Sequence, residues 1–211
     1  QCSITTDQDN NQITAFHPGA MGEAHQNKVA DAANISLGIV APDGRDAMLQ
    51  HSRDFAALGI PFMFDPGQNL PLFSKDELLA CIDQATWCVM NDYESQLMMK
   101  ITELTLDDIA SQVDALIVTR GGEGSCIYAG DKLVDIPAAS IQAAVDPTGC
   151  GDAFRAGLLH GLNCGWDWKT SGRAASLAGA FKVESQGTQN HHFTQDQFRT
   201  RFEESFGYSL P

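Results

Sequence analysis

Hydrophobic positions change their spacing along the chain, and the change predicts alternating strands and helices. Short apolar runs of the buried-strand type occur at 35–40, 60–64, 85–90 and 115–119. Apolar residues recur every three or four positions, as in helices, at 46–58, 74–82, 94–100, 106–112, 153–162, 168–184 and 194–206. The segments 125–128 and 132–136 predict a hairpin. Such alternation is typical of α/β proteins, so we expect a mostly parallel sheet covered by helices.

A second hairpin is predicted before this alternation begins. The β-prone segments 3–6 and 12–16 flank the polar turn cluster 7–11. We expect residues 1–20 to form part of a small β lid and residues 21–211 to form the α/β body.

Composition narrows the class of protein. The 211 residues are 43% hydrophobic, as in an ordinary soluble globular protein. The net charge of −14 disfavours a nucleic-acid partner, which needs a basic face. None of the six cysteines forms a C-x-x-C pair, and several lie in apolar runs, which favours a reducing, cytoplasmic location. No apolar run approaches the roughly 20 residues of a membrane span, so we expect no membrane partner.

Polar residues follow the predicted strands. Asp65, Asn91, Thr119 and the turn at 146–152 lie at or just past strand ends. Ligands of parallel α/β sheets bind beyond the carboxyl ends of the strands, so we expect a ligand site there.

The turn at 146–152 has the residues of an anion site. Gly149 and Gly151 permit backbone angles that are closed to other residues, and a helical pattern follows. The N–H groups of Gly149, Cys150 and Gly151 would face an anion at the helix start. Asp152 could then deprotonate a hydroxyl while these groups hold a phosphoryl group. The alternative is that Asp152 caps the helix, as an Asp at a helix start usually does.

Three segments together resemble a known family. The stretch 146–159 matches the form Asp-Thr/Pro-x-Gly-x-Gly-Asp followed by a helix, a signature of the ribokinase-like (PfkB) carbohydrate and nucleoside kinases. Asn91-Asp92-Tyr93-Glu94 is similar to the Asn-x-x-Glu motif of that family, and the segment 119–124 is similar to its nucleotide loop. The resemblance implies a three-layer α/β/α fold with a mostly parallel sheet and a small β lid.

Further stretches look like bacterial adenosine kinases of this family. They are 2–7, 15–21, 91–94, 146–149 and 184–189. Family members usually run to roughly 300 residues or more. The first strands of the family pattern, with polar residues that hold sugar hydroxyls, have no counterpart in this sequence.

The resemblance implies a role for each motif. Asp152 would take the proton of the acceptor's 5′-hydroxyl as that oxygen attacks the γ-phosphorus of ATP. The nucleotide would be bound by Thr119, Gly121, Gly122, Gly124, Asn91 and Gly187. For the glycine segment the alternative is a simple hairpin turn, and for Gly187 an ordinary loop.

Metal ions are implied at two of the motifs. Asn91 and Glu94 would position Mg²⁺ through water, and the alternative is a helix start with a capping Asn. Asp146 would help bind a monovalent cation such as K⁺, and the alternative is an Asx turn before Pro147.

The acceptor site is implied by two residues of the first part of the chain. Phe16 would stack on a substrate base, and Gln68 would reach its ribose or base. Ordinary hairpin packing is the alternative for Phe16. The lid hairpin could also pair between subunits in a homodimer, since an exposed strand edge needs covering.

The function expected from these residues is ATP-dependent phosphorylation of the 5′-hydroxyl of adenosine, giving AMP. A sugar kinase of other specificity and a non-catalytic nucleotide-binding remnant are the alternatives. A dinucleotide-dependent oxidoreductase is disfavoured, because no G-x-G-x-x-G follows the first strand of the α/β body and opens a helix.

Overall fold

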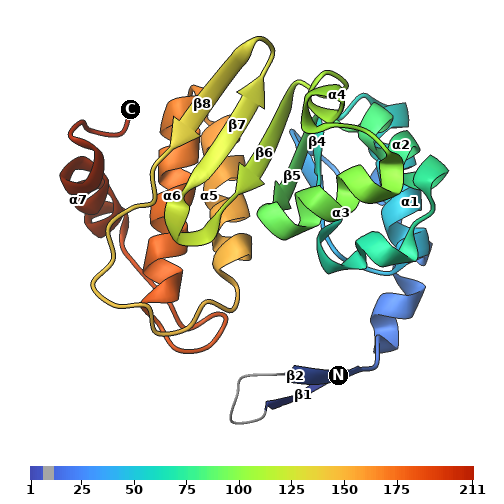
Figure 1. The fold of residues 1–211 in the computed structure, drawn as a ribbon, viewed down its shortest axis with the longest axis horizontal. Helices are drawn as coiled ribbons and strands as arrows, with labels where there is room; N and C mark the ends of the chain where they lie inside the picture. Colours follow the sequence, from blue (N-terminus) through green and yellow to red (C-terminus); the bar gives the residue numbers. More distant parts are fainter. Residues whose placement is uncertain (7–11) are drawn as a thin grey trace. The chain divides into compact units, whose positions relative to one another are not determined.

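The computed structural model describes residues 1–6 and 12–211, and the chain divides into two compact units, Gln1–Ala85 and Thr86–Pro211 (Figure 1). The predicted alternation of strands and helices is confirmed within each unit. The predicted turn cluster at 7–11 lies outside the described residues. The predicted lid boundary near residue 20 stays a prediction.

Unit 1 opens with the predicted hairpin. Strands β1 (Cys2–Thr6) and β2 (Gln12–Phe16) pair antiparallel, with Ser3 opposite Ala15. Two short 3₁₀ helices follow, η1 (Gly19–Gln26) and η2 (Val29–Asp31), in a stretch where the sequence pattern predicted neither strand nor helix.

The rest of unit 1 is a parallel strand pair with its helices. Strands β3 (Gly38–Val40) and β4 (Phe62–Phe64) are parallel and are joined through α1 (Arg45–Leu58). Both strands are shorter than predicted. Since Pro61 has no N–H to donate to a neighbouring strand, β4 begins only at Phe62. The rings of Phe55 and Phe62 stack with centroids 5.4 Å apart, which joins α1 to β4.

Two further elements complete unit 1. The 3₁₀ helix η3 (Gly67–Leu72) follows β4, and α2 (Lys75–Gln84) ends the unit. The predicted capping box of α2 is confirmed, because Ser74 and Glu77 each accept the other's backbone N–H, at 3.4 and 2.9 Å.

The sheet of unit 2 contains the strands that carry the predicted motifs. Strand β5 (Trp87–Asn91) is parallel to β6 (Ala115–Thr119), with Asn91 opposite Thr119. The predicted hairpin is confirmed as β7 (Ser125–Ala129) and β8 (Lys132–Ile136), and β7 pairs antiparallel with β6.

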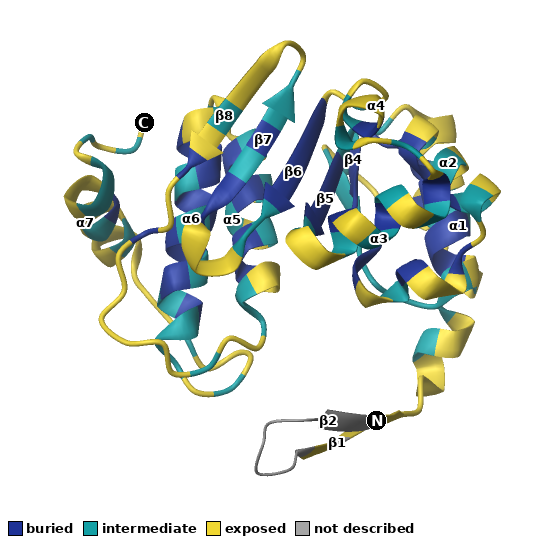
Figure 2. Cartoon of the chain, viewed as in Figure 1, coloured by how far each residue is buried: buried dark blue, intermediate teal, exposed yellow. Residues whose placement is uncertain are grey.

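The helices of unit 2 are α3 (Asp92–Thr102), α4 (Leu106–Ala110), α5 (Cys150–Asn163), α6 (Trp168–Val183) and α7 (Gln195–Phe206). Figure 2 shows the core as buried residues on β5, β6 and the inner sides of α5 and α6, whereas β8 is largely exposed. Helix α5 begins three residues earlier than predicted, which changes the position of Asp152 in it. In the part of the chain that the structure describes, no helix is both long and apolar enough to cross a bilayer.

Candidate active site

The Asn91 and Glu94 side chains close a capping box at the start of α3. Glu94 donates its N–H to Asn91 Oδ1, and Asn91 donates its N–H to Glu94 Oε2, both at 2.7 Å. The alternative interpretation of Asn91 as a helix cap is therefore correct. The Asn91 Nδ2 and Glu94 Oε1 atoms have no hydrogen-bond partner among the described residues, so they remain available for water around a metal ion.

The glycine segment after β6 folds into a tight 3₁₀ turn, η4 (Gly121–Glu123). Arg120 donates its N–H to the Gly124 carbonyl oxygen at 2.8 Å and closes the turn. A Cβ at Gly124, where φ is +87°, would stand 2.0 Å from the Ile136 carbonyl oxygen, so only glycine fits. A Cβ at Gly122 would meet open space. The backbone at Gly121 and Gly122 is thus the part of the turn that a nucleotide can approach.

Arg120 forms an ion pair at the surface of unit 2. Its Nη2 lies 2.7 Å from Asp135 Oδ1 on β8, and this bond to the carboxylate raises the pKa of the guanidinium. This ion pair fastens the glycine turn to the hairpin.

The Asp146 carboxylate ties the start of the 146–152 turn to the loop after α6. Oδ1 accepts the Thr148 N–H at 2.9 Å, which is the predicted Asx turn. Oδ2 accepts the Gly187 N–H at 2.8 Å and Gln186 Nε2 at 3.0 Å. The N–H groups of Thr148 and Gly187 lower the pKa of Asp146 to about 2. Asp146 therefore holds Gly187 against the turn, and its role in binding a cation stays a prediction.

Gly149 forms the N-cap of α5 and supplies no capping side chain. Its φ is +87°, in the left-handed region. The Cys150 N–H donates to the Pro147 carbonyl oxygen at 3.1 Å, so it is already used within the turn. By contrast, the N–H groups of Gly149 and Gly151 have no partner within residues 1–6 and 12–211. Two of the three N–H groups predicted for an anion are thus open.

Asp152 occupies the third helical position of α5 and not the cap, so the capping alternative is wrong. Its side chain is 81% exposed. One carboxylate oxygen, Oδ1, accepts Arg155 Nη2 at 2.8 Å. The partner lies one helical turn further on, on the same face as Asp152. This exposed carboxylate beside open N–H groups is the arrangement that a general base for phosphoryl transfer requires.

The predicted site residues of unit 2 gather toward one end of that unit. Asn91 and Thr119 are register partners at the ends of β5 and β6. In Figure 1 the arrowheads of β5 and β6 point toward the end at which α5 begins. Phe16 and Gln68 belong to unit 1, and both are exposed. Their roles at the acceptor stay predictions.

Sequence reasoning missed Lys182. This lysine is completely buried, and its Nζ donates to the Asp146 carbonyl oxygen at 2.8 Å. The sequence holds a trace of its position, because Lys182 follows buried Thr170, Ala174 and Ala178 at intervals of four. A lysine in line with buried small residues on a helix lies on its inner face.

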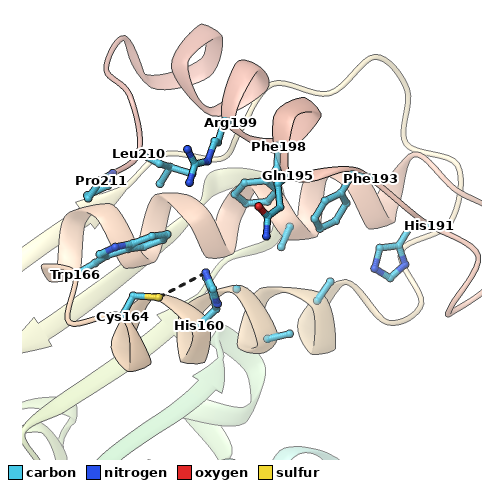
Figure 3. A pocket seen from close by; sticks show the side chains of 14 residues that line it. His160, Cys164, Trp166, His191, Phe193, Gln195, Phe198, Arg199, Leu210 and Pro211 are labelled. Carbon is cyan, nitrogen blue, oxygen red and sulfur yellow. Dashed lines mark hydrogen bonds between the residues drawn. The ribbon is translucent and has the colours of Figure 1, made fainter.

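A cavity of about 580 Å³ lies along α5 in unit 2 (Figure 3). Its walls include His160, Trp166, Phe193, Phe198 and Arg199, from α5, α7 and the segments beside them. Asp152 and Gly149 do not line it. The cavity is mostly apolar, and Ala153, the residue after Asp152, is part of its lining.

The donor set of unit 2 fits a nucleotide with its metal ion better than a metal held by protein alone. Within the described residues, no group of three or more His, Cys, Asp or Glu side chains could hold a metal ion. Mg²⁺ commonly keeps several waters and binds through one or two carboxylates plus substrate phosphates. Glu94 offers one such carboxylate, and Gly149 and Gly151 offer N–H groups to the phosphates.

Comparisons with known proteins show which family the chain resembles. A profile of the pfkB family carbohydrate kinases matches residues 1–195. A nucleoside kinase of Methanocaldococcus jannaschii is 37% identical over 201 residues, which cover 95% of this chain and 66% of that protein. The crystal structure of the M. jannaschii enzyme, an archaeal member of the ribokinase family, matches with a TM-score of 0.86 and 35% identity, over 95% of this chain and 67% of that one.

A bacterial enzyme is more similar in structure. Burkholderia thailandensis nucleoside kinase in complex with inosine matches with a TM-score of 0.95 and 51% identity, over 99% of this chain and 68% of that one. The same enzyme has been solved with ADP and inosine. This chain thus spans about two thirds of the length of these relatives. The likeness confirms the expected ribokinase-like α/β fold, and the chain belongs to the pfkB family of carbohydrate kinases.

Proposed function

We propose that the protein transfers the γ-phosphoryl group of ATP to the 5′-hydroxyl of a purine nucleoside, with adenosine as the first acceptor and AMP as its product. One observation carries the proposal. The start of α5 combines the unpartnered N–H groups of Gly149 and Gly151 with the exposed carboxylate of Asp152. Membership of the pfkB family supports the reaction class.

The chemistry follows from these groups. Asp152 accepts the proton of the 5′-hydroxyl as that oxygen attacks the γ-phosphorus, and the bond from phosphorus to the oxygen of ADP breaks. The N–H groups of Gly149 and Gly151 stabilise the charge of the transferring group. Asn91 and Glu94 would hold Mg²⁺ through water, and the ion would neutralise charge on the phosphates.

The nucleotide is bounded by backbone more than by side chains. The open backbone at Gly121 and Gly122 offers one approach, with Thr119 and Gly124 fixing the turn. The backbone of Gly187 offers a second approach, since the Asp146 carboxylate holds Gly187 beside the 146–152 turn. A K⁺ ion near Asp146 is the rival of the Lys182 proposal below, and the same experiment decides between the two.

The base of the acceptor is the less constrained part. Phe16 would stack on it, and Gln68 would reach the ribose or base. The likeness to an enzyme solved with inosine supports inosine as a second acceptor beside adenosine. A homodimer through the lid hairpin and a cytoplasmic location belong to the same proposal, and light scattering would check the first.

The test is ADP release by the natural full-length protein with ATP·Mg²⁺ and a panel of adenosine, inosine, other nucleosides, ribose and further sugars. We expect adenosine to have the highest kcat/KM. If a free sugar had the highest kcat/KM, the protein would be a sugar kinase and the nucleoside proposal would be wrong. ATP binding by calorimetry without transfer to any acceptor would favour the non-catalytic alternative.

The role of Asp152 as general base is tested with Asp152→Asn. We expect kcat to fall about 10²- to 10⁴-fold, because a general base contributes that much. Asp131→Asn, which makes the same change at an exposed residue in the hairpin turn, is the control and should keep wild-type turnover. Near-full turnover by Asp152→Asn would show that another group takes the proton.

A further inference from the structure

A buried ammonium group lies next to the candidate active site. Lys182 is in the last turn of α6 and is 0% exposed. Moving an ammonium group out of water is costly unless hydrogen bonds replace its hydration. The groups that surround Lys182 Nζ therefore determine what the residue can do.

Lys182 Nζ donates to two backbone carbonyl oxygens from separate segments. The bond to Ser185 is 3.2 Å long and reaches a residue just beyond the end of the same helix. A lysine in the last turn commonly makes such a bond, and the helix dipole favours its charge there. The bond to Asp146 is 2.8 Å long and spans 36 positions of the chain. This second bond reaches the first residue of the 146–152 turn, which helix capping alone does not require.

The lysine also lies beneath the helix start that carries the open N–H groups. A Cβ at Gly149 would stand 3.5 Å from Lys182 Cε and 3.2 Å from the Thr188 carbonyl oxygen. Burial raises the pKa of the Cys150 thiol, and the Lys182 charge opposes that rise. The lysine side chain therefore lies against Gly149, at the start of α5.

We propose that Lys182 is a positioning residue whose ammonium group serves as a built-in monovalent cation for the 146–152 turn. It holds the Asp146 and Ser185 carbonyls together and so fixes the N–H groups of Gly149 and Gly151. Converging backbone carbonyls are also the ligands that K⁺ accepts in place of water. Because the ammonium group occupies that place, these two carbonyls need no K⁺. The anion's identity as a transferring phosphoryl group rests on the proposed function.

The first test is Lys182→Met, which keeps a long apolar side chain and removes the charge. Assays use the natural full-length protein with tetramethylammonium, K⁺ or NH₄⁺ chloride at equal ionic strength. The wild type should turn over equally in all three salts. The variant should lose kcat on the order of 10²-fold in tetramethylammonium, since small misplacement of a catalytic group costs that much. K⁺ or NH₄⁺ should restore most of the loss by occupying the vacated place.

Lys169→Met is the matched control, because Lys169 lies on the same helix and is exposed. It should behave as the wild type in every salt. Lys182→Met with wild-type kcat in tetramethylammonium would overturn the proposal. So would a folded variant that neither K⁺ nor NH₄⁺ restores, or a wild type that itself loses turnover without K⁺.

A second readout does not depend on turnover. K⁺ binding to the variant stabilises its folded state by mass action, so the Tm of Lys182→Met should rise with K⁺ relative to tetramethylammonium. The Tm of the wild type and of Lys169→Met should not differ between these salts. This measurement stands even if no acceptor is found, so failure of the kinase proposal and failure of the Lys182 proposal remain distinguishable. An unchanged Tm in the variant would count against the built-in cation.

Discussion

Helices α3 and α5 each have an acidic residue three positions after the cap, but only in α3 do the cap and the acid bind each other's backbone. Each helix has an acidic residue at its third position, Glu94 in α3 and Asp152 in α5. In α3 the cap is Asn91, and cap and acid satisfy each other's N–H groups. In α5 the cap is Gly149, which has no side chain to offer. Its acid points to solvent, and two N–H groups stay open.

The difference shows what the cap residue decides. A capping side chain goes with an acid that is bound to backbone, as Glu94 is through Oε2, whereas a glycine cap leaves the Asp152 carboxylate without a backbone bond. A capping side chain contributes about 1 kcal/mol of stability, which α3 gains and α5 forgoes. The α5 turn is held from another direction, because Asp146, three residues before the cap, accepts the N–H groups of Thr148 and Gly187. Each helix start therefore has one carboxylate bound to backbone N–H groups. At α3 it is Glu94, within the helix, and at α5 it is Asp146, before the helix.

Gly149→Ala should have the largest effect of the changes that test this comparison. Alanine in the left-handed region costs roughly 1–2 kcal/mol. Its Cβ would also press on the Thr188 carbonyl oxygen at 3.2 Å and shift the turn. We expect a lower Tm in thermal unfolding and a loss of kcat on the order of 10²-fold.

Gly130→Ala provides the control, since Gly130 also has positive φ but a Cβ there would meet open space. It should lower the Tm with no loss of kcat. If Gly149→Ala and Gly130→Ala behaved alike in turnover, the backbone position of Gly149 would have no part in the chemistry.

Asn91→Ala tests the start of α3 through stability, apart from any loss of turnover at the proposed Mg²⁺ site. Loss of the cap leaves the Glu94 N–H without its partner and should cost about 0.5–2 kcal/mol in urea unfolding. Asp152→Asn should leave the free energy of unfolding nearly unchanged, because Asp152 caps nothing. If Asp152→Asn lost more free energy of unfolding than Asn91→Ala, the contrast between the two helix starts would be wrong.

The sequence predicted most of the fold because its local signals were strong. The run 115–119, apolar up to Val118, became β6 without a change of boundary, and Ser74 with Glu77 gave the capping box of α2. The apolar run 60–64 predicted a longer strand than β4. Pro61 shortened it, because proline has no N–H for strand pairing, and the pattern of apolar residues does not show this loss. The start of α5 was predicted three residues too late. A glycine cap in the left-handed region has no side chain that would mark the helix start in the sequence.

Lys182 could not be predicted as part of the site for a different physical reason. Its partners are backbone carbonyls, which every residue possesses, and Asp146 lies 36 positions away. Neither residue type nor spacing encodes such a contact. The Asp146 carboxylate is similar, because its partner Gly187 N–H lies 41 positions away and only the Asx turn to Thr148 is local. Motifs therefore predicted which residues form the site, and the fold determined what holds them.

The smallest expected effect concerns Asp146 and the pH dependence of stability. Its pKa in the folded protein is about 2, below the ordinary value of 3.8, because the N–H groups of Thr148 and Gly187 favour the charged form. Such a group stabilises the fold above the unfolded pKa, and the contribution disappears as pH falls through the folded pKa. The free energy of unfolding of the wild type should therefore exceed that of Asp146→Asn at pH 6, and the difference should shrink between about pH 4 and pH 2. Urea unfolding at stepped pH measures this, with Asp131→Asn as a control whose difference from the wild type should stay constant. A difference for Asp146→Asn that also stayed constant down to pH 2 would mean that the carboxylate of this turn is not the one bound to backbone, and the contrast with α3 would fail at α5.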